Sequence, residues 1–181
     1  MTFADRDPRI GEVLLTPDRI AARIGEMGAE ITEDYRDRPP LLVCVLKGAY
    51  VFLTDLARRI DLSVDIDFIA VSSYGNSTRT SGVVRLIKDL DVDIADRHVL
   101  LVEDIVDSGL TLRYLRRNLQ ARGPASLSVA TFLARSSADL GALDVRYVGF
   151  TIPDEAWVVG YGLDHAQELR NLPYVARYAR P

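Results

Sequence analysis

The sequence predicts an α/β protein with a mostly parallel central sheet flanked by helices, and three observations support this fold class. Apolar, β-branched runs alternate with helical patterns along the chain. The runs are hydrophobic almost without interruption, as in LLVCVL, which is typical of strands covered on both faces of a parallel sheet. The 181 residues suffice for one sizeable domain with its own core and are few for two.

The expected strands are the segments richest in apolar and β-branched residues. They span residues 41–47, 65–73, 98–104, 127–134 and 145–150. Strands that follow one another through helices require crossover connections, and such connections join parallel strands.

Helical patterns fill the segments between these strands. Thr16 and Pro17 give an N-cap and first-turn signal for a helix that extends to about residue 36. A second helix is expected over residues 48–60. In a third, which starts at Gly109, leucines recur at helical spacing until ARGP closes the helix. The arginines of this third helix are interpreted as its solvated side: Arg113, Arg116 and Arg117.

Residues 72–94 depart from this alternation because their first half is polar and rich in Gly, Ser and Thr. Long polar loops inside compact domains are lids or disordered connectors. Since the segment lies between two expected sheet strands, we interpret it as a lid.

The composition is that of an ordinary globular protein, with 48% hydrophobic and 27% charged residues. The net charge is −4 and the basic residues are scattered, which disfavours nucleic acid or an anionic membrane as a partner. The single cysteine, Cys44, lies in an apolar run and is expected in the core, so no internal disulfide is possible. No segment resembles a signal peptide or a membrane span, and we expect a cytoplasmic protein.

The stretch VLLVEDIVDSGLTL, residues 99–112, carries the strongest chemical signal. Ligands of open α/β sheets bind beyond the carboxyl ends of the strands, where this stretch turns from strand to helix. Backbone N–H groups and the helix dipole make such a turn a phosphate cradle, and the hydroxyls of Ser108 and Thr111 add donors. Gly109 lets the backbone approach a ligand closely.

Glu103 and Asp104 are adjacent carboxylates, which repel each other unless they hold hydroxyls or a metal. A ribose diol offers two donors to them, and Mg²⁺ can bridge such oxygens. The pattern therefore predicts a site for a ribose 5-phosphate. A solvated loop with incidental acids is the alternative, and the apolar run before it and the helix after it disfavour that reading.

The same stretch resembles the phosphoribosyl pyrophosphate motif of type I phosphoribosyltransferases, in the version of the hypoxanthine-guanine enzymes. Three other stretches match that family in order: VLKGAYVF its first loop, SSYGNSTRTSG its mobile lid, and IPDEAWVVGYGLDHAQELRNLPYV its purine and pyrophosphate segment. The resemblance extends from about residue 10 to 178. It implies the type I phosphoribosyltransferase fold as a single domain over residues 1–181, with a core of about 10–150. A small hood is expected from residues 151–181 with the N-terminal residues.

The activity implied by this resemblance is Mg²⁺-dependent purine salvage. The 5-phosphoribosyl group moves from 5-phosphoribosyl 1-pyrophosphate to N9 of hypoxanthine or guanine, giving IMP or GMP and pyrophosphate. Catalysis then depends on stabilising the leaving diphosphate and positioning the base. The resemblance also implies a homo-oligomer, either a dimer or a tetramer.

Family roles transfer to the matching positions of this chain. The 5′-phosphate and ribose would be held by Glu103, Asp104, Asp107, Ser108, Gly109, Leu110 and Thr111. Pyrophosphate would be held by Lys47, Gly48 and Arg170, with a peptide bond before Lys47 that is often cis in the family. The lid would contribute Ser73 and Tyr74. The purine would meet Arg135, Trp157 and Val158, and the metal would meet Glu103, Asp104 and Asp164. Asp107 would handle the proton of purine N7 as the catalytic residue.

Two departures from the family pattern concern the base. Arg135 replaces a lysine that donates to the 6-oxygen, and the two side chains are not interchangeable at such sites. The segment before Trp157 is one residue longer than the usual PDxFVV spacing, so that either this loop bulges or the stacking role is shifted. His165 stands where the family often has Tyr and receives no role.

These departures keep a xanthine-preferring transferase open as an alternative. An RNA-binding regulator of the same superfamily is a further alternative, disfavoured by the net charge and by the Glu103–Asp104 pair. An inactive paralogue is disfavoured by the intact Lys47, Asp107 and Arg170.

Overall fold

The computed structural model describes residues 7–73 and 84–179. Helices and strands alternate along most of the chain, as the sequence predicts. Their order is β1 (Ile10–Leu15), α1 (Pro17–Asp34), β2 (Leu41–Leu46), α2 (Tyr50–Ala57), β3 (Asp65–Ser73), β4 (Val84–Lys88), β5 (His98–Val106), α3 (Leu110–Gln120), β6 (Ser126–Arg135), β7 (Val145–Ile152), β8 (Val158–Val159) and β9 (Val175–Tyr178).

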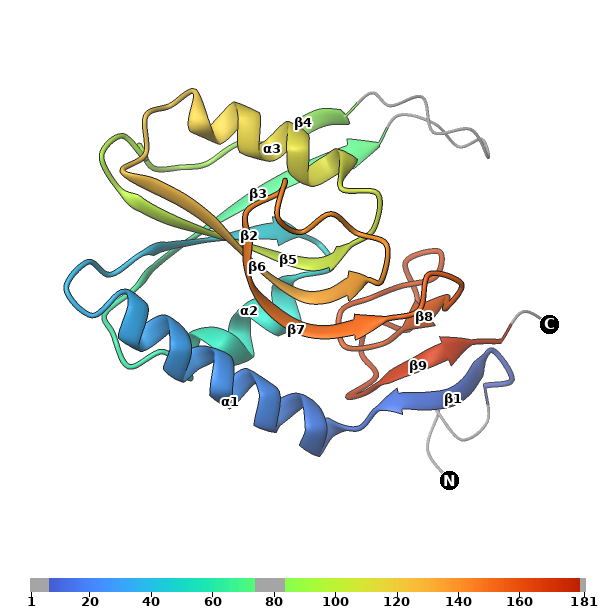
Figure 1. The fold of residues 1–181 in the computed structure, drawn as a ribbon. Coiled ribbons are helices and arrows are strands. Elements are labelled where there is room, and N and C mark those ends of the chain that lie inside the picture. The colour runs from blue at the N-terminus through green and yellow to red at the C-terminus, as the bar shows by residue number, and fades with distance from the viewer. Residues whose placement is uncertain (1–6, 74–83, 180–181) are drawn as a thin grey trace.

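The central sheet has six strands in the order β4-β3-β2-β5-β6-β7. Every neighbouring pair in it is parallel except β3 and β4, which are antiparallel. Helices α1 and α2 cover one face of this sheet and α3 covers the other (Figure 1). The predicted fold class, a mostly parallel sheet flanked by helices, is thereby confirmed.

The hydrophobic core lies in two layers, one on each face of the sheet. Leu42 and Cys44 of β2 pack in the layer that contains α1 and α2. Val43 and Val45 of the same strand pack in the layer beneath α3. Successive side chains of a strand point to opposite faces, so burial on both faces explains why LLVCVL is apolar throughout. Cys44 is fully buried, as predicted.

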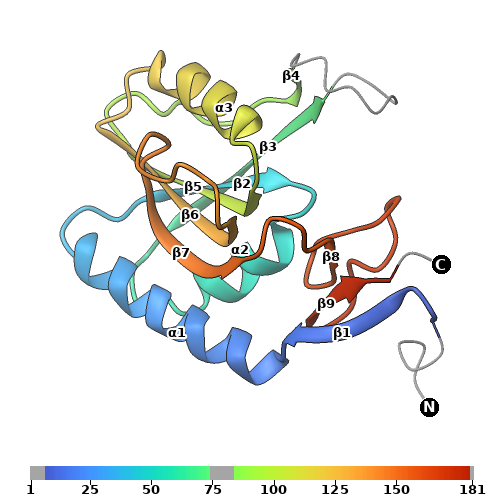
Figure 2. The same cartoon turned by 45° about the vertical axis from the view of Figure 1, so that its right-hand side comes forward.

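A second, three-stranded sheet lies beside the C-terminal end of the large one (Figures 1 and 2). Its order is β1-β9-β8, with β9 antiparallel to both neighbours. Its own small cluster of buried residues consists of Val159, Leu169 and Leu172. None of its strands was among the expected ones, because β8 has two residues and β9 has four.

Several boundaries differ from the expected ones. The start of α1 is the predicted one, since Thr16 accepts a hydrogen bond from the backbone N–H of Arg19 and caps the helix, whereas its end at Asp34 comes before the expected residue 36. β5 extends to Val106, two residues beyond its predicted end. Residues 72–94, interpreted as a loop, contain strand β4. The lid expected within them falls mostly on residues 74–83, outside the described part of the chain. Among the described residues, no helix is long and apolar enough to cross a membrane.

Candidate active site

The turn between β5 and α3, expected to be an anion cradle, is shaped by Gly109. Gly109, the residue before α3, has a φ of +72°, in the left-handed region that favours glycine. A Cβ atom at this position would lie 2.7 Å from Cδ1 of Leu143. A cavity of 290 Å³ opens over this turn and is lined by residues 103–112. The backbone N–H groups at the start of α3 have no partners within the helix and are available to an anion.

Arg113 holds this turn from α3. Its Nη1 donates to the carbonyl oxygen of Ser108 at 2.9 Å. Arg113 and Arg117 are exposed, as expected for the solvated side of this helix, although Arg113 also bonds the turn. Arg116 is partly buried, and its Nη1 lies 3.2 Å from Oδ2 of Asp144. The contact of Arg116 has no local sequence signal, because Asp144 is distant in the chain.

The acidic pair, Glu103 and Asp104, lies near the end of β5, and its carboxylates have few hydrogen-bond partners among the described residues. Glu103 is 6% exposed, and its Oε2 has no hydrogen-bond partner in the part of the chain that the structure describes. Burial, followed by the charge of Asp104, raises the pKa of Glu103 well above its ordinary value. Burial also raises the pKa of Asp104 to about 6, although a hydrogen bond from the backbone N–H of Ile105 opposes the shift. Buried carboxylates in this state accept a cation or hydroxyl donors readily.

The loop after β2 lies directly against the acidic pair. A Cβ atom at Gly48 would lie 1.4 Å from Oδ2 of Asp104, so only glycine fits here. The Leu46–Lys47 peptide bond is cis, as the family resemblance implies. The Nζ of Lys47 donates to Oε1 of Gln167 at 3.2 Å. The two residues expected to hold pyrophosphate are thus adjacent to the expected ribose and metal residues.

A segment between β8 and β9 completes this side of the site. Nη2 of Arg170 forms an ion pair with Oδ1 of Asp164 at 2.7 Å, and its Nη1 donates to the carbonyl oxygen of Gly162 at 2.7 Å. Gln167 accepts from both Lys47 and Arg170, the latter at 3.3 Å. Gln167 was missed by the sequence analysis, and no local pattern marks it, because its partners come from a distant loop. These groups share a cavity of 650 Å³ with Glu103, Asp104 and Thr111.

The three carboxylates expected to bind a metal all line the 650 Å³ cavity. Among the described residues, however, no group of three or more His, Cys, Asp or Glu side chains is close enough to hold an ion. Mg²⁺ is commonly bound by one or two carboxylates together with water and substrate phosphates. The unpartnered Oε2 of buried Glu103 is an oxygen donor of this kind, so the acidic pair fits such an ion.

The residues expected to meet the purine surround a third cavity, of 220 Å³. Trp157 lies on its wall and is 49% exposed, and Val158 is buried in β8 beside it. Arg135, the last residue of β6, places its Nε 3.7 Å from Oδ1 of Asp107. The structure therefore brings these three residues together with the expected catalytic carboxylate.

The longer segment before Trp157 folds as a compact turn. The backbone N–H of Ala156 donates to the carbonyl oxygen of Pro153 at 3.1 Å. Ala156 is fully buried, and Trp157 lies on the cavity wall. Whether this loop bulges or the stacking role is shifted stays a prediction.

The three cavities form one connected site because Asp104 lines all of them. The expected lid residues are only partly described. Ser73 is the last residue of β3, whereas Tyr74 lies outside the described residues.

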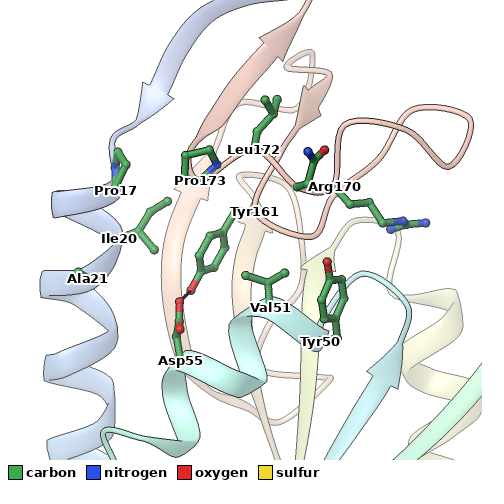
Figure 3. Close-up of a pocket in the computed structure, with 11 residues that line it drawn as sticks. Pro17, Ile20, Ala21, Tyr50, Val51, Asp55, Tyr161, Arg170, Leu172 and Pro173 are labelled. Atoms are coloured by element: carbon green, nitrogen blue, oxygen red, sulfur yellow. Dashed lines mark hydrogen bonds between the residues drawn. The ribbon is translucent and has the colours of Figure 1, made fainter. Parts of the chain in front are cut away.

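A further cavity, of 480 Å³, lies between α1, α2 and the segment before β9 (Figure 3). Its wall is largely apolar, and the side chain of Arg170 extends away from it (Figure 3). The hydroxyl of Tyr161 donates to Oδ2 of Asp55 at 2.6 Å and links this segment to α2. Burial, with this hydrogen bond, raises the pKa of Tyr161. Of the expected site residues only Arg170 reaches this cavity, which therefore lies behind the site.

Comparison with known proteins agrees with this geometry. The phosphoribosyl transferase domain family matches residues 12–166. A hypoxanthine-guanine phosphoribosyltransferase of Mycobacterium avium is 54% identical over 172 residues, covering 92% of this chain and 84% of its own. A crystal structure of a hypoxanthine phosphoribosyltransferase from Staphylococcus aureus superposes with a TM-score of 0.90 at 40% identity, covering 99% of this chain and 97% of that one.

A more distant structure is that of a Trypanosoma cruzi hypoxanthine phosphoribosyl transferase, studied for the role of its C-terminal region in oligomeric state and enzymatic activity. It has a TM-score of 0.87 at 36% identity and covers 96% of this chain and 94% of its own.

Proposed function

Because the chain belongs to the phosphoribosyltransferase family, we propose that it transfers a 5-phosphoribosyl group to hypoxanthine or guanine in purine salvage. The donor is 5-phosphoribosyl 1-pyrophosphate, and the products are IMP or GMP and pyrophosphate. The observation that carries this proposal is that Asp104 lines three neighbouring cavities: one with both cationic and acidic side chains, one over the turn before α3, and one beside a tryptophan.

On the donor side, the 5′-phosphate occupies the turn from Asp107 to Thr111, where N–H groups and hydroxyls converge. Glu103 and Asp104 accept hydrogen bonds from the ribose hydroxyls, which provides the partner that the buried Oε2 of Glu103 lacks within the described chain. The backbone at Lys47 and Gly48 and the guanidinium of Arg170 hold the pyrophosphate. Leaving-group charge is thereby stabilised where it develops.

Mg²⁺ belongs to this proposal as a ligand of Glu103 and Asp104, with Asp164 at the same cavity. When bound, the ion neutralises the phosphate and carboxylate charges that meet there. Asp164 keeps its ion pair with Arg170, so its contribution to the ion is secondary to that of the acidic pair.

On the base side, the purine packs against Trp157, with Val158 beneath it and Asp107 at its N7 edge. Asp107 holds and accepts the proton that the base must lose when N9 attacks C1 of the ribose. Arg135 donates to the 6-oxygen, which selects against 6-amino bases because their donor group cannot accept this bond. Ser73 and Tyr74 close over the reaction centre as a lid.

The chain acts as one domain in which the three-stranded sheet forms a hood over the base. We propose that it is a cytoplasmic homo-oligomer, a dimer or a tetramer. Strands β3 and β4 support an oligomer because they expose three large apolar side chains: Ile66 (46%), Phe68 (37%) and Ile87 (67%). The single cysteine, Cys44, is a free thiol, which agrees with a reducing compartment.

A xanthine-preferring transferase remains the second candidate, because Arg135 replaces the usual lysine at the base. The test is nucleotide formation from 5-phosphoribosyl 1-pyrophosphate and Mg²⁺ with hypoxanthine, guanine, xanthine, adenine or uracil. Turnover of hypoxanthine and guanine only is expected. Turnover of xanthine alone would replace the substrate assignment. Inactivity with all five bases while the donor still binds would favour the RNA-binding regulator.

The role of Asp107 is tested by Asp107→Asn, which keeps the shape but removes the proton acceptor. Turnover should fall by about 10²–10⁴-fold, the usual contribution of general acid–base catalysis, while donor binding persists. Steady-state rates and calorimetric titration with the donor measure the two effects. Unchanged turnover would remove Asp107 from the mechanism.

A further inference from the structure

Arg135 makes contacts that its proposed role at the base does not require. Its Nη1 donates to the carbonyl oxygen of Pro153 at 2.9 Å and also to that of Ala156. These two carbonyls belong to the compact turn that leads directly into Trp157. One guanidinium nitrogen therefore holds both ends of the turn.

Residues 153–156, which form the turn, make few other contacts with the rest of the described chain. Pro153, Asp154 and Glu155 are exposed, and only Ala156 is buried. On its other side, Oδ1 of Asp154 accepts from the backbone N–H of Ser137 at 3.1 Å. Ser136, next to Arg135, donates from its backbone N–H and its hydroxyl to the carbonyl oxygen of Ile152, just before the turn. Arg135 is the residue whose one side chain bonds both ends of the turn to the end of β6.

The same guanidinium also faces the base cavity. Its Nε is buried, lies 3.7 Å from Oδ1 of Asp107 and has no hydrogen-bond partner among the described residues. An arginine fork divides its donors in this way between two directions. A lysine ammonium is a single point charge on a flexible four-carbon stem and would have to serve both directions from one position.

We infer that Arg135 is a positioning residue for Trp157, and that it sets the affinity for the base through the turn at 153–156 in addition to its direct contact. The inference rests on the proposed function, since it assumes that Trp157 meets the purine. In this chain, the arginine and the longer turn act as one unit.

Trp157 is the only tryptophan, so its fluorescence reports the turn without any substrate. Arg135→Lys and Arg135→Met should both shift its emission to longer wavelength and increase its quenching by acrylamide, because the indole loses its fixed position. The KM for hypoxanthine should rise about tenfold, as expected for losing charge-assisted hydrogen bonds, with little change in the KM for the donor. Thermal melts verify folding, and the apolar methionine keeps the volume of the stem.

Arg23→Lys is the matched control. Nη2 of Arg23 donates to the carbonyl oxygen of Val148 at 2.9 Å, and its Nε to that of Gly149 at 3.3 Å. The substitution therefore removes hydrogen bonds of an arginine to backbone carbonyls, as the Arg135 variants do. Its carbonyls, however, belong to β7, the strand before the turn, and lie away from the cavity. Emission, quenching and both KM values should match those of the wild type.

Wild-type emission and quenching in both Arg135 variants would overturn the inference, even if the KM for the base rises, because the effect would then be direct contact only. An equal fluorescence change in Arg23→Lys would overturn it as well, since the loosening would be general. Failure of the wild type to use any 6-oxopurine would refute the proposed function, while the substrate-free fluorescence would still decide whether Arg135 holds the turn.

Discussion

The phosphoribosyl side and the base side of the site are built in different ways. On the proposed phosphoribosyl side, one continuous segment, residues 103–111, supplies the acidic pair and the expected anion cradle, while the loop at Gly48 and the segment with Arg170 complete the wall. On the base side, the cavity wall combines the end of β6 at Arg135, the start of β8, and residues 163–164. The first side is local in sequence, whereas the second exists only after distant segments have packed.

This difference determines how each side responds to change. On the phosphoribosyl side the backbone of Gly48 packs directly against Asp104, so even one added methyl group at this position has a large effect. The base side is held by a few hydrogen bonds and ring contacts, so each substitution there has a graded effect. We therefore expect substitutions on the phosphoribosyl side to have larger effects than those on the base side, and the opposite order would refute this difference.

The largest effect is expected from Gly48→Ala. The added Cβ would collide with the carboxylate of Asp104, and displacing a positioning group by about 1 Å can cost 10²-fold in rate. Turnover should therefore fall by about 10²-fold or more. Gly25→Ala in α1 is the control, because no atom lies within 4 Å of its added Cβ, and it should stabilise the fold by about 0.5–1 kcal/mol. Activity in Gly48→Ala close to that of Gly25→Ala would contradict the tight packing.

An intermediate effect is expected on stability in Asp104→Asn. The pKa of Asp104 is raised to about 6 from an ordinary 3.8, so protonation favours the folded state. The contribution of protonated Asp104 to the stability of the fold is fully present below pH 3.8, its ordinary pKa, and is lost as the pH rises through about 6. Removing the charge should raise the Tm of the ligand-free protein by about 3–6 °C at pH 7.5 and by less at pH 5.

Calorimetry at the two pH values measures this change, with the exposed Asp37→Asn as control. Asp104→Asn should also weaken binding of Mg²⁺ and donor, because a carboxylate is lost. An equal rise of the Tm at both pH values would show that the burial of charge is not the cause.

The smallest effect is expected from His165→Ala. The His165 ring stacks on Tyr178 at a centroid distance of 4.1 Å and meets Trp157 edge-on at 6.3 Å. Loss of such ring contacts, about 0.5–1.5 kcal/mol, should raise the KM for the base about threefold and leave the KM for the donor unchanged. His165→Phe keeps a ring and should retain wild-type kinetics. A larger change in the donor KM than in the base KM would place His165 on the other side of the site.

The sequence predicted where residues 103–111 lie, because they belong to one strand, turn and helix, and the structure places them at the carboxyl end of β5. The roles assigned to these residues, which the family resemblance implies, stay predictions. The fold class followed from the same continuous apolar runs. The extension of β5 to Val106 was missed because the acidic residues interrupt its pattern.

The hood could not be predicted in the same way. Strands β8 and β9 are too short for a periodic signal and form only because they pair with each other and with β1. The contact of Gln167 with Lys47 joins segments that are distant in sequence. Arg135 was expected to contact the base, but its hydrogen bonds to the turn could not be predicted, because backbone carbonyls carry no sequence signal.

The pairing of β1 with β9 has a consequence for the order in which the site matures. Ile10 lies opposite Tyr178, so the hood closes only when the two most distant strands of the described chain meet. Contacts between such remote segments form late in folding because loop-closure entropy must first be overcome. A nascent chain on the ribosome can thus complete its phosphate cradle early, but it acquires a place for the base only after β9 has emerged.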